Sequence, residues 1–178
     1  MKESGRSTEH VTPGLDELFS EHHKKVFMAA YRVTGNPQDA EDILQSVFLR
    51  LLDRAEMPSA SHQLGGYLRR AAVNQGIDLL RSRKRAPQDP LQETDFASTS
   101  GAAEAGVERS ELQRRLRTAL LTLDPASAEV FALRYFEDYS NAEIARILES
   151  TPNCIAVTLH RARARLQESL GELSGEDR

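Results

Sequence analysis

Two short helices joined by a tight turn are predicted over residues 139–166, and this pattern constrains the fold more than any other feature of the chain. Ser140, with Glu143 three residues later, is a capping box that starts the first helix. Thr151 caps the second helix, and Pro152 occupies its first position, where a missing N–H costs nothing. The residues of the second helix that must face inward, from their i, i+4, i+7, i+11 spacing, are Ile155, Leu159, Ala162 and Leu166. This arrangement predicts a helix-turn-helix, whose second helix can enter a major groove of DNA.

A plain helical hairpin with a solvated arginine face shows the same pattern, so the rest of the chain must decide between the two interpretations. The chain has 178 residues, enough for one mid-sized domain or two small ones. Its formal net charge is -4, so any contact with nucleic acid must come from local basic patches on an otherwise acidic molecule. The positions of the charges therefore matter more than their sum.

Several classes of function find no support in the sequence. Cys154 is the only cysteine, which excludes an internal disulfide, and without a resolving cysteine we expect it to pack rather than to act in redox chemistry. His22 and His23 lack partners at metal-ligand spacing, so we expect one of them to be buried and the other exposed. The sequence shows no arrangement of nucleophile, base and orienting residue, and no phosphate-binding glycine loop. We therefore expect neither an enzyme nor a bound cofactor or metal.

The ends of the chain and its apolar stretches bear on its location. Residues 1–14 are polar, which predicts a disordered tail and no signal peptide. No apolar stretch approaches the roughly 20 residues needed to span a bilayer. We therefore expect a cytoplasmic protein without membrane insertion.

Three amphipathic helices are predicted in the first half of the chain, at residues 15–34, 37–54 and 64–85, from apolar positions that repeat at three and four. Gly35 can take a left-handed C-cap, and Asn36 can cap the second helix. Acidic residues crowd the first turns of that second helix. They complement the helix dipole, and they also offer a docking surface for a basic partner.

The third predicted helix is strongly basic. It has a single acid, Asp78, against the cations Arg69, Arg70, Arg81, Arg83, Lys84 and Arg85. A run of cations on one helix is often merely solvated, but this run also offers a set of phosphate-binding groups.

A linker separates these helices from the second half of the chain. Residues 86–106 are rich in proline, serine, threonine and acids, and predict a flexible acidic linker. A second domain is predicted over residues 107–171, opening with a helix at 107–121, and residues 172–178 form a C-terminal tail. No stretch alternates with period two for long enough to be a strand. The expected fold is all-α, with two small helical domains of which the second contains the helix-turn-helix.

Three segments, taken in this order, resemble the extracytoplasmic-function (ECF) sigma factors of bacterial RNA polymerase. That family's polymerase-docking helix is similar to NPQDAEDILQSVFLRLL, and its promoter-melting helix is similar to GYLRRAAVNQGIDLLRSRKR. Its C-terminal module is similar to LDPASAEVFALRYFEDYSNAEIARILESTPNCIAVTLHRARARL. The resemblance implies sigma region 2 at residues 15–85 and sigma region 4 at residues 107–171.

The resemblance also implies which residues carry the function. Core RNA polymerase would be bound through Asp39, Asp42, Gln45 and Leu49. The minus-ten element would be opened by the third helix and the loop before it, through Ser59, Ser61, His62, Gln63, Arg69, Arg70, Asn74, Asp78, Arg81, Arg83, Lys84 and Arg85. The loop residues of this set stand where members of the family hold an extruded base. The minus-thirty-five element would be read by Ser140, Thr151, Asn153, Ala156, Val157, His160, Arg161 and Arg163.

The sequence departs from the family pattern at several of these places. Ala156 and Thr158 stand where basic residues are usual, and Val157 replaces a small polar residue, so direct readout of guanine is reduced. Glu149 replaces the turn glycine and adds a negative charge to the same region. The sequence therefore predicts a weak or unusual upstream element. In the third helix Val73 replaces a common arginine, which we expect to weaken contact with the DNA backbone.

The leading interpretation is a promoter-specificity subunit whose partners are core RNA polymerase, promoter DNA and an anti-sigma protein, with no small-molecule substrate. One alternative is a sigma-like mimic that sequesters an anti-sigma protein, which residues 156–158 favour. Another is a stand-alone helix-turn-helix repressor, which leaves the acidic second helix unexplained. When polymerase is absent, we expect an inhibitor or an intramolecular contact to pack the two domains together.

Overall fold

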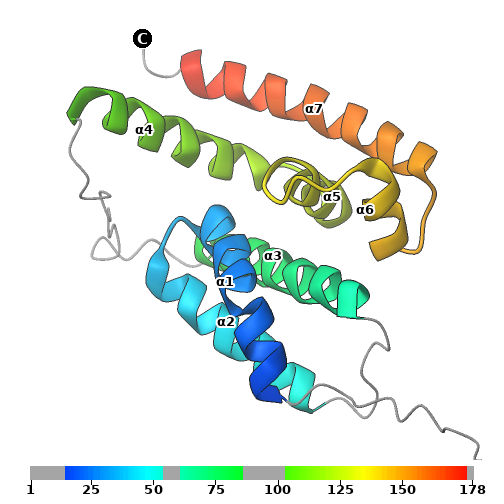
Figure 1. Cartoon of the computed structure of the whole chain (residues 1–178). Helices are drawn as coiled ribbons and strands as arrows, with labels where there is room; N and C mark the ends of the chain where they lie inside the picture. Colours follow the sequence, from blue (N-terminus) through cyan, green and yellow to red (C-terminus); the bar gives the residue numbers. More distant parts are fainter. Residues whose placement is uncertain (1–14, 54–60, 86–102, 176–178) are drawn as a thin grey trace, which may run out of the picture.

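The computed structural model describes residues 15–53, 61–85 and 103–175. Within these residues the chain forms α-helices and no strand (Figure 1). In chain order they are α1 (Leu15–Thr34), α2 (Pro37–Leu52), α3 (Ser61–Arg85), α4 (Ala103–Leu120), α5 (Pro125–Tyr135), α6 (Asn141–Ile147) and α7 (Pro152–Gly175). Helices α1 to α3 form one bundle and α4 to α7 a second. The expectation of an all-α protein with two small helical domains is therefore confirmed for the described residues.

The corner between α1 and α2 has the predicted caps. Gly35 adopts a φ of 71°, in the left-handed region where a side chain is disfavoured. The side chain of Asn36 accepts hydrogen bonds from the backbone N–H groups of Gln38 and Asp39, at 2.8 and 3.2 Å. These bonds satisfy donors that have no partner within the helix, so α2 starts at Pro37 as expected.

The core of the first domain comes from the apolar stripes of its three helices. Its fully buried side chains include Leu18, Val26 and Val33 of α1, Val47 and Leu51 of α2, and Leu68 and Val73 of α3. Val73 stands where the family commonly has an arginine, and this replacement was expected to weaken contact with the DNA backbone. The structure shows that the Val73 side chain is wholly enclosed. Valine at this position therefore contributes to packing in the described structure.

Helix α3 begins earlier than the sequence predicted. Its first residue is Ser61 rather than Leu64, so Ser61, His62 and Gln63 lie in the first helical turn and not in a loop. The prediction of a loop was wrong for these three residues. Ser59, the remaining residue expected to hold an extruded base, lies outside the described residues.

The second domain also starts earlier than expected, because α4 begins at Ala103, inside the stretch predicted as linker. Asp124 caps α5 by accepting a hydrogen bond from the backbone N–H of Ser127, at 3.0 Å. The capping box of α6 is present as predicted. Ser140 N–H donates to a carboxylate oxygen of Glu143 at 2.8 Å, and Glu143 N–H donates to Ser140 Oγ at 3.3 Å.

The turn between α6 and α7 completes the helix-turn-helix. Glu149, which stands in place of a glycine, has a φ of 51°, so the turn requires the left-handed conformation that glycine would accept more easily. Thr151 Oγ1 accepts a hydrogen bond from Cys154 N–H at 3.2 Å, which caps the start of α7. The inward-facing residues predicted from spacing are all buried, namely Ile155, Leu159, Ala162 and Leu166.

The two domains pack against each other along α3. Figure 1 shows α3 between the rest of the first domain and the helices α5 and α6, and both of these helices contact it. Arg117 of α4 also reaches the first domain, where its guanidinium occupies the space that a β-carbon on Gly35 would need. The expected packing of the two domains is thus an intramolecular contact in this structure, and the basic helix lies within it.

Candidate nucleic-acid interface

The outer face of α7 presents a continuous exposed surface. The structure places there all the residues that were expected on the second helix of the helix-turn-helix and at its cap, namely Thr151, Asn153, Ala156, Val157, His160, Arg161 and Arg163, and each is exposed. Val157 is 44% exposed, although it is apolar. Ser140 is exposed as well, at the start of α6. The structure therefore brings these side chains together on one open face, with an apolar centre and cations toward its C-terminal side.

The central residues of α3, by contrast, face the second domain. A single carboxylate oxygen, Oε1 of Glu129 on α5, accepts hydrogen bonds from Arg70 Nε at 2.6 Å and from Asn74 Nδ2 at 2.7 Å. Arg70 also donates to the backbone carbonyl of Ile147, at 3.3 Å. The Glu129 side chain is only 13% exposed, so these bonds are shielded from water. Two residues expected to contact the minus-ten element are thus bound within the protein.

A second carboxylate lies between the two domains, in the segment just after the end of α5. Glu137 accepts a hydrogen bond from Arg32 of α1 at 2.8 Å, and its other oxygen lies 4.0 Å from Arg69. The guanidinium of Arg69 stacks over the ring of Tyr139, with its central carbon 4.4 Å from the ring centroid. Burial raises the pKa of the Glu137 carboxyl, and the hydrogen bond from Arg32 opposes this rise. Burial also raises the pKa of the Tyr139 phenol.

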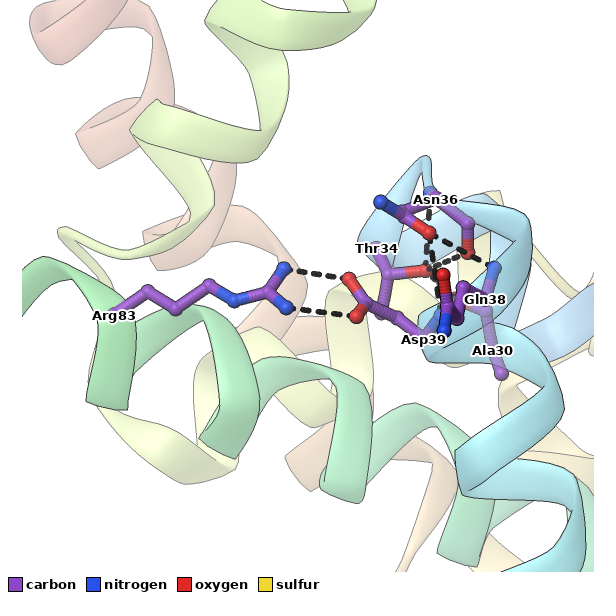
Figure 2. Close-up of polar contacts among 6 residues, drawn as sticks. All are labelled: Ala30, Thr34, Asn36, Gln38, Asp39 and Arg83. Atoms are coloured by element: carbon purple, nitrogen blue, oxygen red, sulfur yellow. Dashed lines mark hydrogen bonds and ion pairs between the residues drawn. The ribbon is translucent and has the colours of Figure 1, made fainter. Parts of the chain in front are cut away.

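The C-terminal half of α3 is divided between internal contacts and solvent. Arg81 donates to the backbone carbonyl of Leu123 at 2.9 Å. Arg83 forms a bidentate pair with Asp39 at 2.5 and 2.7 Å, which Figure 2 shows reaching from α3 to the start of α2. Lys84 and Arg85 are exposed at the end of the helix. Among the described cations of α3, these two are the most accessible to a phosphate backbone.

The pair with Arg83 changes the role expected for Asp39. Asp39 was expected on the polymerase-docking face, but it is only 7% exposed and its carboxylate points toward α3. The hydrogen bonds that Arg83 donates to Asp39 raise the pKa of Arg83, which keeps the guanidinium charged. The structure thus places Asp39 in a contact that fixes α2 against α3, and not on a free surface.

The other residues expected to dock polymerase do share an open face of α2. Asp42 and Gln45 are exposed, and Leu49 is 61% exposed. Leu52, one turn further along, is 49% exposed and extends the apolar part of this face. An exposed leucine pair beside an acid and an amide on one helix face is a surface suited to a protein partner.

A shallow cavity of about 260 Å³ lies between α2 and α3. Its lining residues are Val47, Arg50, Tyr67, Arg70, Ala71, Asn74, Gln75 and Asp78. Asp78 and Asn74, two of the residues expected at the minus-ten element, therefore meet here beside an aromatic ring. Such a combination of a ring with polar groups is the kind of surface on which an unstacked base can lie.

The remaining expectations concern isolated residues. His22 is buried at 5% exposure and His23 is half-buried, so only the first part of the expectation for this pair is met. Cys154 is exposed, and the expected packing role was wrong, because its position on α7 faces away from the core. Among the residues that the structure describes, no group of three acids, histidines or cysteines could hold a metal ion. None of the described helices is long and apolar enough to cross a membrane.

The sequence did not reveal the residues that cover α3. Glu129, Glu137 and Arg32 belong to no expected site, yet they make the shortest contacts between the two domains. The available signal was charge complementarity, since acids at positions 129 and 137 lie in the domain that follows a strongly basic helix. Spacing alone could not show that these acids face that helix.

The chain matches two family models that divide it as the structure does. Sigma-70 region 2 matches residues 18–86, and Sigma-70 region 4 matches residues 113–166. The first match begins within α1 and runs through α3, and the second covers the C-terminal part of α4, all of α5 and α6, and α7 as far as Leu166.

Curated relatives agree with these matches. The RNA polymerase sigma-E factor of Streptomyces avermitilis is 30% identical over 156 residues, which are 88% of this chain and 84% of the relative. The ECF RNA polymerase sigma factor SigW of Bacillus subtilis is 27% identical, over 92% of this chain and 94% of the relative. The ECF RNA polymerase sigma factor SigE of Mycolicibacterium smegmatis is 31% identical over 92% of this chain, which spans 64% of that longer protein. With both sigma regions present in order on two helical domains, this chain belongs to the ECF sigma factors of bacterial RNA polymerase, which direct the initiation of transcription.

Proposed function

We propose that the chain binds core RNA polymerase through the open face of α2, opens promoter DNA with α3, and reads duplex DNA upstream with α7. The observation that carries the proposal is the free face of α2. Leu49 and Leu52 are exposed there beside Asp42 and Gln45, while the opposite face of the same helix is buried in the domain core. Apolar side chains that stand free on an otherwise charged helix gain stability by burial against a partner.

Transcription with purified polymerase tests this proposal. We expect run-off transcription with core enzyme and a genomic promoter library to give specific starts that depend on the protein. We expect Leu49→Ala to weaken binding to core enzyme by about tenfold, since a truncated interface leucine costs roughly 1–2 kcal/mol. Leu112→Ala is the matched control, because Leu112 is 63% exposed but lies on α4, outside the proposed face. Equal losses in both variants would contradict the assignment of this face.

The DNA contacts are proposed from the same two helices. On α3, Lys84 and Arg85 supply exposed charge for the DNA backbone, and Arg69, Arg70 and Arg81 join them once the second domain moves away. On α7, Arg161 and Arg163 contact phosphates while Val157 can contact a thymine methyl group. Few of the exposed side chains at the start of α7 can donate to guanine, so upstream recognition by this protein is weak. High affinity for a standard ECF upstream element would contradict that conclusion.

Control by an anti-sigma protein is part of the proposal. The supporting observation is the exposed apolar surface at Val157 in α7 and Leu49 in α2, since each can be covered by a protein as well as by its functional partner. The same surfaces would serve a mimic that only sequesters an anti-sigma protein. The run-off assay separates the two functions, because the mimic gives no specific starts and a sigma factor does.

A further inference from the structure

The outer side of α7 follows a regular pattern of its own. The residues that this helix buries repeat at i, i+4, i+7 and i+11, and they are Ile155, Leu159, Ala162 and Leu166. The residue two positions before each of these lies on the opposite side, because two residues turn an α-helix by about 200°. The four residues of this outer line, which we call the α7 ridge, are all exposed, and they are Asn153, Val157, His160 and Ala164. The ridge is therefore the outermost line of a helix that lies at the edge of the second domain (Figure 1).

Arginines lie on both sides of the α7 ridge. Arg161 is on the side that faces the start of α5, where it lines a cavity together with Ser127 and Thr158. Arg163 follows two residues later, so it lies about 200° round the helix, on the other side. Both arginines are exposed, whereas the ridge between them contains no arginine, lysine or carboxylate. A helix seated in a DNA groove needs this distribution, with cations toward the two phosphate strands and uncharged side chains toward the base edges.

The side chains of the ridge fit one kind of base pair. In the major groove, guanine is read by arginine or lysine, which donate to its O6 and N7 atoms, and the ridge has neither residue. Val157 is 44% exposed and offers only methyl groups, which match the C5 methyl group of thymine. Asn153 has a carboxamide that can pair with the N6 and N7 atoms of adenine. These two residues precede His160 on the helix, and the N-terminal residues of such a helix lie nearest the bases.

We infer that the upstream element of this protein is an A·T sequence, in which Val157 packs against a thymine methyl group and Asn153 binds an adenine. The inference rests on the proposed role of α7 in reading duplex DNA, and it adds which bases are recognised. Val157 and Asn153 are four residues apart, or about 6 Å along the helix, and a base-pair step is about 3.4 Å. The thymine and the adenine therefore lie within about two base pairs of each other.

Selection with the holoenzyme tests this preference. The full-length protein is combined with core RNA polymerase and a promoter library in which the upstream segment is randomised and each promoter carries its own barcode in the transcript. We expect sequencing of the run-off products to show thymine and adenine enriched within about two base pairs of each other, without enrichment of guanine. A preference dominated by guanine, or no base preference in this segment, would overturn the inference and leave the proposed function intact. The absence of any specific start would instead overturn the proposed function.

Deoxyuridine removes the thymine methyl group alone and so tests the contact of Val157. Each upstream thymine of the selected promoter is replaced in turn, and holoenzyme affinity is measured by run-off transcription at limiting protein. We expect one replacement to lower the affinity by about fourfold, which is the effect of one buried methyl group. Val157→Ser should lose this difference, because serine has no methyl group to pack against the base. The matched control is Gln167→Ser, an exposed position about three turns further along the same helix, which should keep the difference.

Two outcomes of the deoxyuridine experiment would count against a methyl contact by Val157. One is equal affinity of the wild-type holoenzyme for every thymine promoter and its deoxyuridine counterpart. The other is a difference that persists unchanged in the Val157→Ser variant, since another residue would then make the contact.

The adenine contact has an equivalent test. Replacing the selected adenine by 7-deazaadenine removes the N7 acceptor and leaves pairing with thymine unchanged. We expect this change to lower the affinity of the wild-type holoenzyme by about threefold to tenfold, and to have no effect on the Asn153→Ala variant. Asn153→Ala leaves the cap of α7 in place, because that cap is the bond from Cys154 N–H to Thr151 Oγ1, at 3.2 Å. Equal sensitivity of both proteins to 7-deazaadenine would contradict the assignment of adenine to Asn153.

Discussion

The pair between Asp39 and Arg83 links α2 to α3 and allows a quantitative test of its role. The Asp39 side chain is 9% exposed and that of Arg83 is 51% exposed. Breaking a fully buried pair costs about 3–5 kcal/mol, whereas an exposed pair contributes about 0.2–1 kcal/mol. A bidentate pair with one half-exposed partner lies between these limits, so we expect Arg83→Ala to lower the free energy of unfolding by about 1–2 kcal/mol.

A double-mutant cycle isolates this interaction from other roles of Asp39. Asp39 also lies in the first turn of α2, where a carboxylate interacts with the helix dipole by about 0.3–1 kcal/mol. That contribution remains when Arg83 is already alanine, so Asp39→Ala should cost about 1 kcal/mol less in the Arg83→Ala background than in the wild type. Urea unfolding of the four proteins measures the difference. Additivity within about 0.3 kcal/mol would refute the coupling. As a control, Arg85→Ala should change stability by less than about 0.5 kcal/mol, because Arg85 is exposed.

Three other substitutions give distinct expected outcomes. Glu149→Gly should stabilise the protein by about 0.5–1 kcal/mol in thermal unfolding, because glycine adopts the left-handed backbone conformation of this position without strain. Asp138 has a left-handed conformation too, but Asp138→Gly should stabilise the protein less, since aspartate tolerates that conformation better than glutamate. Ala156→Arg should tighten binding to upstream duplex and steepen its salt dependence by about 0.9 in the log–log slope, and an unchanged slope would contradict a phosphate contact at this position. The hydrogen bonds from Ser127 lower the pKa of Asp124, so the carboxylate stabilises the fold above its unfolded pKa and this contribution is lost as pH falls through the lowered value. The stability advantage of wild type over Asp124→Asn should therefore shrink between about pH 5 and about pH 3, and a constant difference would argue against the cap.

Local features of the sequence were sufficient to predict most of the helices. The caps at Asn36, Ser140 and Thr151 depend only on a side chain and the backbone that follows it, and all three form as predicted. The buried face of α7 followed from spacing for the same reason, because helical periodicity is a local property. The predicted start of α3 was wrong by about one turn. Ser61, His62 and Gln63 read as polar loop residues, yet they precede an apolar run and join its helix.

The candidate site was harder to predict, because its residues depend on contacts between segments far apart in the chain. Arg70 and Glu129 are separated by 59 positions, and Asp39 and Arg83 by 44. A cation on a helix has the same sequence pattern whether it faces water, DNA or an acid in another domain. Sequence therefore identified α3 as basic but not which of its cations are already paired. The exposed face of α7 was predictable, since no other element of the described structure covers it.

The ionic character of the contact along α3 has a consequence for how the protein responds to salt. Added salt screens the pairs made by Arg70 and Arg69 with the second domain, and it also weakens the attraction of DNA for the same side chains. Release of α3 from the second domain raises the apparent affinity for DNA, whereas the screening of phosphate contacts lowers it. We expect wild-type affinity for a single strand to vary less with ionic strength than that of Glu129→Ala, and under the proposed role of α3 this would make promoter opening less sensitive to salt.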